Sequence, residues 1–269
     1  MALNRRIEDW KGRRVWLVGA SSGIGAALAT LLLERGARVA LTSRSRDALD
    51  ALAAGHGDAL VLPADVTDAD GLAAAHAQIL AAWGGVDLAI FNAGTHESMR
   101  AWELDLAKAK TLIDTNLKGV LNGLAAALPD MLAQKSGAVA VVASVAGYAG
   151  LPTSLIYGAT KAALINLAET LYVDLRASGV GVSLINPGFV ATPATAQNDF
   201  EMPALITASQ AADEILAGWR KGEFEIHFPK RFTRWMKTLR LLPYTAFFAL
   251  TSRLVKNEAA TPTPTRETP

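Results

Sequence analysis

Three side chains of this sequence have the types and spacing of a proton-transfer site: Ser144, Tyr157 and Lys161. Tyr157 and Lys161 stand at positions i and i+4, so on a helix they project from one face and can act on one bound molecule. A phenol has an unperturbed pKa near ~10, and a nearby ammonium group such as that of Lys161 would favour the phenolate. Ordinary exposed helices carry the same spacing, so the surrounding sequence must decide between the two interpretations.

Ser144 follows the apolar run 138–143, which we interpret as a buried strand. Its hydroxyl would then lie at the carboxyl end of that strand, where open α/β sheets bind their ligands, and could hydrogen-bond a carbonyl oxygen. From Val15 to Ile226, strand-like apolar runs alternate with amphipathic helical runs. This alternation predicts an α/β fold with a doubly wound parallel sheet in a single domain.

The N-terminal segment has the order strand, glycine-rich turn, helix, over residues 15–18, 19–25 and 26–34. Glycines permit a tight turn and bring the backbone close to a pyrophosphate, whose charge is favoured by free amides at a helix start. A turn without any ligand is the alternative. We predict a dinucleotide site and assign these turn residues to it: Gly19, Ser21, Ser22, Gly23, Ile24 and Gly25.

The segment 42–46, after the second predicted strand, indicates which dinucleotide would bind. Such sites place a carboxylate there for the adenosine ribose, or a cation for a 2′-phosphate. The segment has no acid but contains Arg44 and Arg46, so NADP(H) is favoured over NAD(H), with Arg44 as the better candidate. A solvated arginine pair that opens the next helix remains the alternative.

Together these features resemble the short-chain dehydrogenase/reductase family, in its single-domain branch, from about Lys11 to Pro229. The resemblance implies a Rossmann fold and further site residues. Asp65 and Val66 would contact the adenine, and Asn116 would hold a water for proton relay. The fourth-strand motif and the segment over the nicotinamide would supply the remaining contacts: Asn92, Ala93, Gly94, Pro187, Gly188, Val190 and Thr192. Val18 and Phe91 depart from the family pattern, which usually has threonine and asparagine there, and put the rigidity of the cofactor site in doubt.

The resemblance also implies a reaction, the transfer of a hydride between the nicotinamide and a carbonyl or secondary alcohol. Tyr157 would move the proton and Ser144 would hold the substrate oxygen. Lys161 would bind the nicotinamide ribose and lower the pKa of Tyr157. With NADP(H) favoured, we predict a ketone or aldehyde reductase with a hydrophobic substrate. An NAD-linked secondary alcohol dehydrogenase and a non-catalytic dinucleotide-binding regulator are the alternatives, because fold alone does not entail catalysis.

Composition limits the other classes of function. A chain of 269 residues that is 51% hydrophobic suits one domain with a large core, and a net charge of +1 argues against nucleic acid as a partner. The absence of cysteine excludes disulfides and thiol chemistry. The N-terminus has no signal-peptide core, so we expect a cytoplasmic location. The histidines show no metal-ligand spacing, although one of them, His96, could line the substrate pocket: His56, His76, His96 and His227.

Two long helices are predicted, over 108–134 and 154–177. In the family this pair usually packs against a second subunit, so their small and aliphatic residues make a homodimer or homotetramer plausible. Core packing within one subunit explains the same residues. Residues 193–206 are predicted to form a mobile lid over the substrate.

The C-terminal segment 230–257 is basic and amphipathic, and no acid occurs between Ile226 and Asn257. It is too short and too interrupted, by Pro243, to span a bilayer. We expect it to pack on its own domain or a partner subunit, to guard a hydrophobic substrate entrance, or to lie on an anionic membrane surface. Residues 258–269 are predicted to be a disordered tail. A helical stripe over the segment would consist of Phe232, Trp235, Met236, Leu239 and Leu242.

Overall fold

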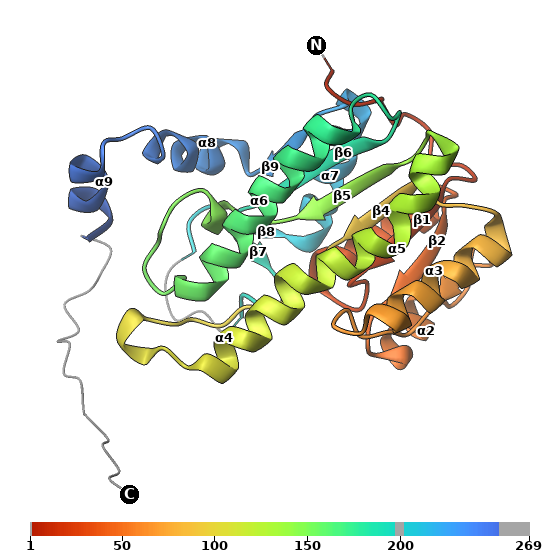
Figure 1. Cartoon of the computed structure of the whole chain (residues 1–269), viewed down its shortest axis with the longest axis horizontal. Helices are drawn as coiled ribbons and strands as arrows, with labels where there is room; N and C mark the ends of the chain where they lie inside the picture. The colour runs from red at the N-terminus through yellow and green to blue at the C-terminus, as the bar shows by residue number, and fades with distance from the viewer. Residues whose placement is uncertain (1, 197–201, 253–269) are drawn as a thin grey trace, which may run out of the picture.

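The computed structural model describes residues 2–196 and 202–252, and its centre is a parallel sheet (Figure 1). The sheet has seven strands in the order β3-β2-β1-β4-β5-β6-β9, all paired in parallel. This confirms the predicted doubly wound α/β fold. The strands are β1 Arg14–Val18, β2 Arg38–Thr42, β3 Ala59–Val61, β4 Leu88–Phe91, β5 Ala138–Val142, β6 Gly181–Pro187 and β9 Glu225–Phe228. A second, two-stranded sheet pairs β7 Val190–Ala191 with β8 Ile206–Thr207.

The central strands are apolar because both faces of the sheet are covered by helices. Along β1 the side chains alternate between two cores, with Trp16 and Val18 in one and Val15 and Leu17 in the other. All four are essentially inaccessible to solvent. Burial of one such side chain contributes about 1.5–3 kcal/mol, so this alternation fixes the register of the sheet between its helical layers.

Helices pack on both faces of the sheet. One layer consists of α1 Gly23–Glu34, α2 Arg46–Ala53 and α7 Ala208–Lys221, whose apolar residues share one core. The other consists of α3 Ala69–Trp83, α5 Gly119–Gln134 and α6 Leu155–Leu175. The helix α4 Leu106–Ile113 precedes α5 and extends past the sheet in Figure 1.

The helix expected over 108–134 is interrupted by a π-helical turn, Asp114–Lys118, between α4 and α5. Asn116 lies in this turn and is fully buried. Its side-chain amide bonds both backbone groups of Thr95, the residue that follows the fourth-strand motif. The wider turn therefore sets Asn116 against a loop of the site, an effect that helical periodicity does not predict.

Two helices follow the sheet, α8 Lys230–Leu239 and α9 Tyr244–Thr251, and α9 lies at the far end of the molecule from α2 and α3 (Figure 1). The stripe predicted for this segment is only partly right. Met236 and Leu239 are buried, but Trp235 is 49% exposed. Thr233, rather than Trp235, lies on the buried face of α8, because its hydroxyl bonds the His227 ring and the Pro229 carbonyl.

Within residues 2–196 and 202–252, no helix has the length and apolar character that crossing a bilayer requires. The predicted tail 258–269 lies outside the described residues, as do 253–257 of the amphipathic segment and 197–201 of the predicted lid. The division of the chain at Pro229 stays a prediction.

Candidate active site

The carboxyl ends of the central strands open into a cleft of about 1670 Å³. It gathers segments that are far apart in the sequence: the glycine turn after β1, the ends of β2, β4, β5 and β6, and the start of α6. Among the described residues predicted for the site, only Gly25 and Asn116 lie outside the lining. The lining includes Gly19, Ser21, Ser22, Gly23, Ile24, Arg44, Asp65, Val66, Asn92, Ala93, Gly94, Ser144, Tyr157, Lys161, Pro187, Gly188, Val190 and Thr192.

The glycine turn is packed directly on the motif that ends β4. Gly19 has a φ of +92°, and a Cβ there would lie 2.4 Å from the backbone nitrogen of Ala93. The side-chain amide of Asn92 donates from Nδ2 to the Gly19 carbonyl at 2.8 Å. A Cβ on Gly25 would lie 2.0 Å from that same carbonyl oxygen, so Gly25 is needed for close packing of the turn, and its contact with a ligand stays a prediction.

The start of α1 is suited to a pyrophosphate. The N-cap residue Ser22 makes no side-chain capping bond within the described structure, so amides of the first turn stay available to an anion. No acidic residue occupies that turn. A dinucleotide therefore fits the residues present, with its pyrophosphate at this helix end.

The adenosine end of the cleft combines one cation and one carboxylate. Arg44 is exposed at the end of β2, whereas Arg46 does not line the cleft. The Asp65 carboxylate accepts bonds from the Thr67 amide at 2.9 Å and the Thr67 hydroxyl at 2.8 Å. The Thr67 amide, and to a smaller extent Arg44, hold the pKa of Asp65 below its usual value. The nearby Ser43 hydroxyl is buried without a hydrogen-bond partner in the described structure, so it can serve a ligand.

Ser144, Tyr157 and Lys161 are brought together where β5 ends and α6 begins. Ser144 lies two residues after β5, and its side chain hydrogen-bonds the Tyr157 phenol. Lys161, only 4% exposed, donates from Nζ to the Val142 carbonyl at 3.0 Å. Its Nζ lies 5.7 Å from the centre of the Tyr157 ring. These positions allow one small molecule to meet all three side chains.

The expected lowering of the Tyr157 pKa is not found in the protein alone. Burial raises the pKa of Tyr157, and the bond from Ser144 offsets only part of that effect. Burial also lowers the pKa of Lys161 to about 8. The expectation was wrong because it considered the charge of Lys161 without the loss of water around both groups.

Asn116 lies behind the cleft rather than in its lining. Its Oδ1 accepts from the Thr95 amide at 2.7 Å, and its Nδ2 donates to the Thr95 carbonyl at 2.9 Å and to Thr160 Oγ1 at 3.3 Å. A Cβ on Gly94 would touch both Asn116 Oδ1 and Lys161 Nζ. Asn116 thus supports the segment beside Lys161, and the relay role implied by the resemblance stays a prediction.

The substrate end of the cleft contains His96, as the sequence suggested, together with residues that the sequence did not single out, such as Met99. Met99 forms a bridge with the segment before α6, donating its amide to the Thr153 carbonyl at 2.8 Å. His96 packs edge-on against Tyr157, with ring centres 4.7 Å apart, and burial lowers its pKa. The sequence predicted that segment 230–257 could guard the substrate entrance, but it did not predict which residues of α8 would form the wall. The lining on this side includes His96, Met99, Leu151, Phe189, Phe232, Trp235 and Met236.

This arrangement is that of a dinucleotide-binding α/β protein, with a serine, a tyrosine and a lysine gathered at the carboxyl edge of its sheet. The model of the short chain dehydrogenase family matches residues 13–202, and the chain belongs to that family. It is an enzyme of the short-chain dehydrogenase/reductase type, an oxidoreductase.

Similar proteins agree with this assignment. A Myxococcus xanthus protein described as an uncharacterized oxidoreductase is 37% identical over 246 residues, which cover 90% of this chain and 97% of that protein. A similarly described Staphylococcus epidermidis protein is 35% identical, over 74% of this chain and 87% of its own. A short-chain dehydrogenase/reductase of Burkholderia phymatum, solved in complex with NAD, has a TM-score of 0.79 at 26% identity, over 86% of this chain and 94% of that chain.

Proposed function

We propose that this enzyme is an NADP(H)-dependent reductase of ketones or aldehydes with a hydrophobic substrate. The observation that carries the proposal is the hydrogen-bonded pair of Ser144 and Tyr157, which faces an apolar wall in the same cleft as Arg44. When bound, the nicotinamide supplies a hydride to the carbonyl carbon. A proton on the oxygen then completes an alcohol.

The chain's own residues account for the proton. Ser144 donates a hydrogen bond to the substrate oxygen and orients it. Tyr157 gives its proton to that oxygen as negative charge develops there. The raised pKa of Tyr157 suits reduction, because the phenol is then protonated before the reaction. Lys161, with a pKa of about 8, is mostly charged at neutral pH and stabilises the phenolate that remains.

The cofactor preference is tested at Arg44. Replacing Arg44 with alanine should weaken NADPH binding by about 10-fold to 100-fold and leave NADH binding nearly unchanged, because a charge-assisted phosphate contact is lost. Arg46→Ala is the matched control, since Arg46 lies on the same turn but outside the cleft lining. Fluorescence titration with both nucleotides measures the affinities.

Equal loss for both nucleotides would refute the assignment of Arg44. It would favour the NAD-linked alcohol dehydrogenase instead, in line with the NAD complex of the Burkholderia phymatum relative. Turnover is measured separately with a panel of ketones and aldehydes. Tight NADPH binding without turnover of any carbonyl class would favour the non-catalytic regulator.

The proposal includes partners. Exposed aliphatic side chains on α4, α5 and α6 support a homodimer or homotetramer, which sedimentation velocity can test against a monomer. The C-terminal segment contributes a wall of the substrate cleft through α8. The exposed aliphatic residues are Ile113 in the last turn of α4, Leu121 and Leu132 on α5, and Leu155 and Val173 on α6.

A further inference from the structure

The outer face of α8 is cationic and is not neutralised within the part of the chain that the structure describes. Arg231, Arg234, Trp235 and Thr238 are exposed at the spacing of one helical face. Lys230 and Lys237 form ion pairs with Glu223 and Glu225, but within residues 2–196 and 202–252 the arginines 231, 234 and 240 form none. The free positive charge of this helix therefore points away from the domain.

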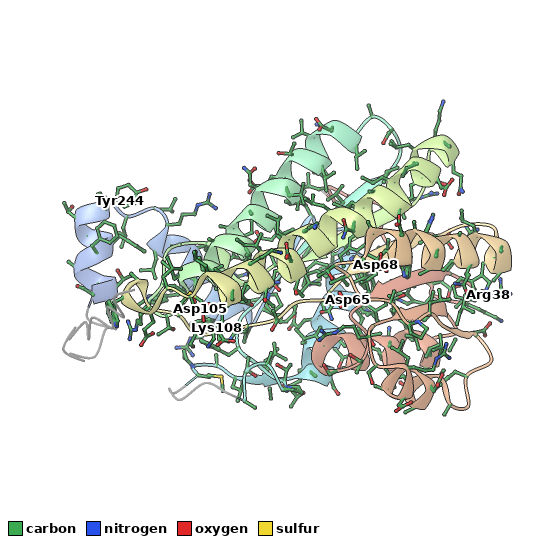
Figure 2. The ribbon with its side chains drawn as sticks, turned by 60° about the horizontal axis from the view of Figure 1, so that its bottom comes forward. Arg38, Asp65, Asp68, Asp105, Lys108 and Tyr244 are labelled. Atoms are coloured by element: carbon green, nitrogen blue, oxygen red, sulfur yellow. The ribbon has the colours of Figure 1, made fainter. Side chains whose placement is uncertain are left out.

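The segment that follows is apolar and open to solvent. Residues 241–252 contain no charged side chain, and only Phe247 and Thr251 of this stretch are buried. Leu241 is 83% exposed, Tyr244 77% and Phe248 59%. Figure 2 shows Tyr244 on α9 at the opposite end of the molecule from Arg38. An exposed apolar patch beside cations is costly in water and calls for a partner that satisfies both.

We propose that this face, formed by the outer side of α8 and by residues 241–252, docks on a bilayer that contains anionic lipids. Arginines would pair with the headgroups, while tyrosine, tryptophan and phenylalanine occupy the interfacial layer that aromatic side chains favour. A second copy of the chain is a poorer occupant, because it would set the same unpaired arginines against each other.

The docking face meets the active site at Trp235. This side chain lines the cleft and is also half exposed on the outer side of α8. Phe232 and Met236 line the cleft beside it. A docked protein would thus present the mouth of its cleft to the lipid, so the substrate would be an apolar carbonyl compound taken from the bilayer. This last step rests on the proposed reductase function, whereas the docking does not.

Docking is tested by cosedimentation of the full chain with vesicles of phosphatidylcholine, alone or with phosphatidylglycerol. The intact chain should pellet with the anionic vesicles only. Arg231→Gln/Arg234→Gln should lower partitioning roughly 30-fold, because each cation near the surface contributes about one factor of five. Phe248→Ser should lower it about tenfold. The matched controls Arg5→Gln/Arg6→Gln and Leu3→Ser change exposed side chains outside this face and should have no effect.

Failure of the intact chain to bind anionic vesicles would overturn the proposal, as would equal losses in the control variants. Equal binding to soluble polyglutamate, with no loss in Phe248→Ser, would indicate an acidic protein partner instead. A changed sedimentation coefficient of Phe248→Ser without lipid would indicate a second copy. Turnover of a small water-soluble carbonyl compound should be unaltered in Arg231→Gln/Arg234→Gln, so loss of docking is distinguishable from a wrong reaction.

Discussion

The carboxyl edge of the sheet and the C-terminal helices border one cleft, but different interactions attach them to the rest of the domain. At the edge, β1 and β4 are linked by a backbone ladder, and Gly19 lies directly against Ala93. By contrast, α8 is fastened by a few side chains. Its polar links are the ion pairs of Lys230 and Lys237 and the bond between Thr233 and His227.

This difference separates chemistry from substrate entry. The side chains proposed to react lie just after β5 and on α6, and Lys161 on α6 is tied to β5 through the Val142 carbonyl, which preserves their geometry relative to the sheet. The wall of the substrate end lies on a helix that can change its position at the cost of a few contacts. We therefore expect substitutions at the edge to abolish turnover or cofactor binding, and substitutions under α8 to change substrate affinity.

The largest effect is expected for Tyr157→Phe. Loss of the phenolic proton should lower kcat about 1000-fold, while NADPH binding stays within about twofold. Steady-state rates at saturating NADPH and fluorescence titration measure the two quantities. The control is Tyr172→Phe, on the same helix, whose hydroxyl bonds the Leu3 carbonyl and no other group among the described residues. Substantial turnover in Tyr157→Phe would place the proton donor elsewhere in the cleft.

The next effect is expected for Gly19→Ala. Its Cβ would meet the Ala93 backbone at a positive φ, so the turn and β4 must separate. NADPH affinity should fall at least about 100-fold, and the free energy of unfolding by roughly 3 kcal/mol. Gly55→Ala is the control, because Gly55 has a φ of +81° with open space around it and should lose only about 1 kcal/mol. Equal losses of unfolding free energy in both variants would mean that the positive φ, and not the close packing against Ala93, makes glycine necessary at position 19.

The sheet edge could be predicted because its signals are local. An apolar run that ends in a glycine turn, or in Ser144, specifies both the strand and the position of the motif at its carboxyl end. To place Tyr157 and Lys161 together with Ser144, the sequence had to supply only the i, i+4 spacing of the tyrosine and the lysine on one helix. The match to the family covers this part of the chain, which supports the same interpretation.

The substrate end could be predicted only in part, at His96 and in outline at the C-terminal segment, since the rest depends on contacts between distant segments. Nothing near Met99 indicates that its backbone pairs with Thr153. The orientation of α8 follows from Glu225 and His227 on β9, which hold Lys237 and Thr233 and turn Trp235 outward. The pKa of Tyr157 likewise depends on how deeply the fold buries it.

A smaller effect is expected for Glu225→Gln, which tests the attachment of α8. Burial would raise the pKa of Glu225, but bonds from Lys237, Tyr148 and Asn186 outweigh burial and lower it. Loss of this carboxylate should reduce the free energy of unfolding by about 2 kcal/mol, allowing for partial exposure. The KM for apolar carbonyl substrates should rise several-fold, with kcat for small ones nearly constant.

Chemical denaturation and initial rates measure these effects. Asp58→Asn, which breaks the exposed pair with Arg38 at the opposite end of the molecule from Tyr244 (Figure 2), is the control and should change neither. If Glu225→Gln instead lowered kcat and kcat/KM equally for all substrates, α8 would contribute to the chemistry as the carboxyl edge of the sheet does. The separation of chemistry from substrate entry would then fail.

The smallest effect is expected from the protonation of His227. Burial, with Lys237 and Lys230 nearby, lowers its pKa to about 4, from a usual value near 6.5. Between pH 6.5 and 4 the unfolded chain binds a proton that the native ring does not, so stability falls as the pH falls through this window. Because the ring is partly solvated, the loss should be about 1 kcal/mol. A His227→Asn variant should lack it.

The part of the structure that loses stability when His227 is protonated tests whether α8 and the carboxyl edge of the sheet open independently. His227 bonds Thr233 on α8, so protonation should first weaken the attachment of that helix and leave the glycine turn intact. An NMR titration of the ring gives its pKa, and amide exchange at pH 4.5 should show lower protection in α8 than in β1. Equal loss of protection in both elements would show that the helix and the sheet edge open as one unit, since independent attachment requires α8 to open first.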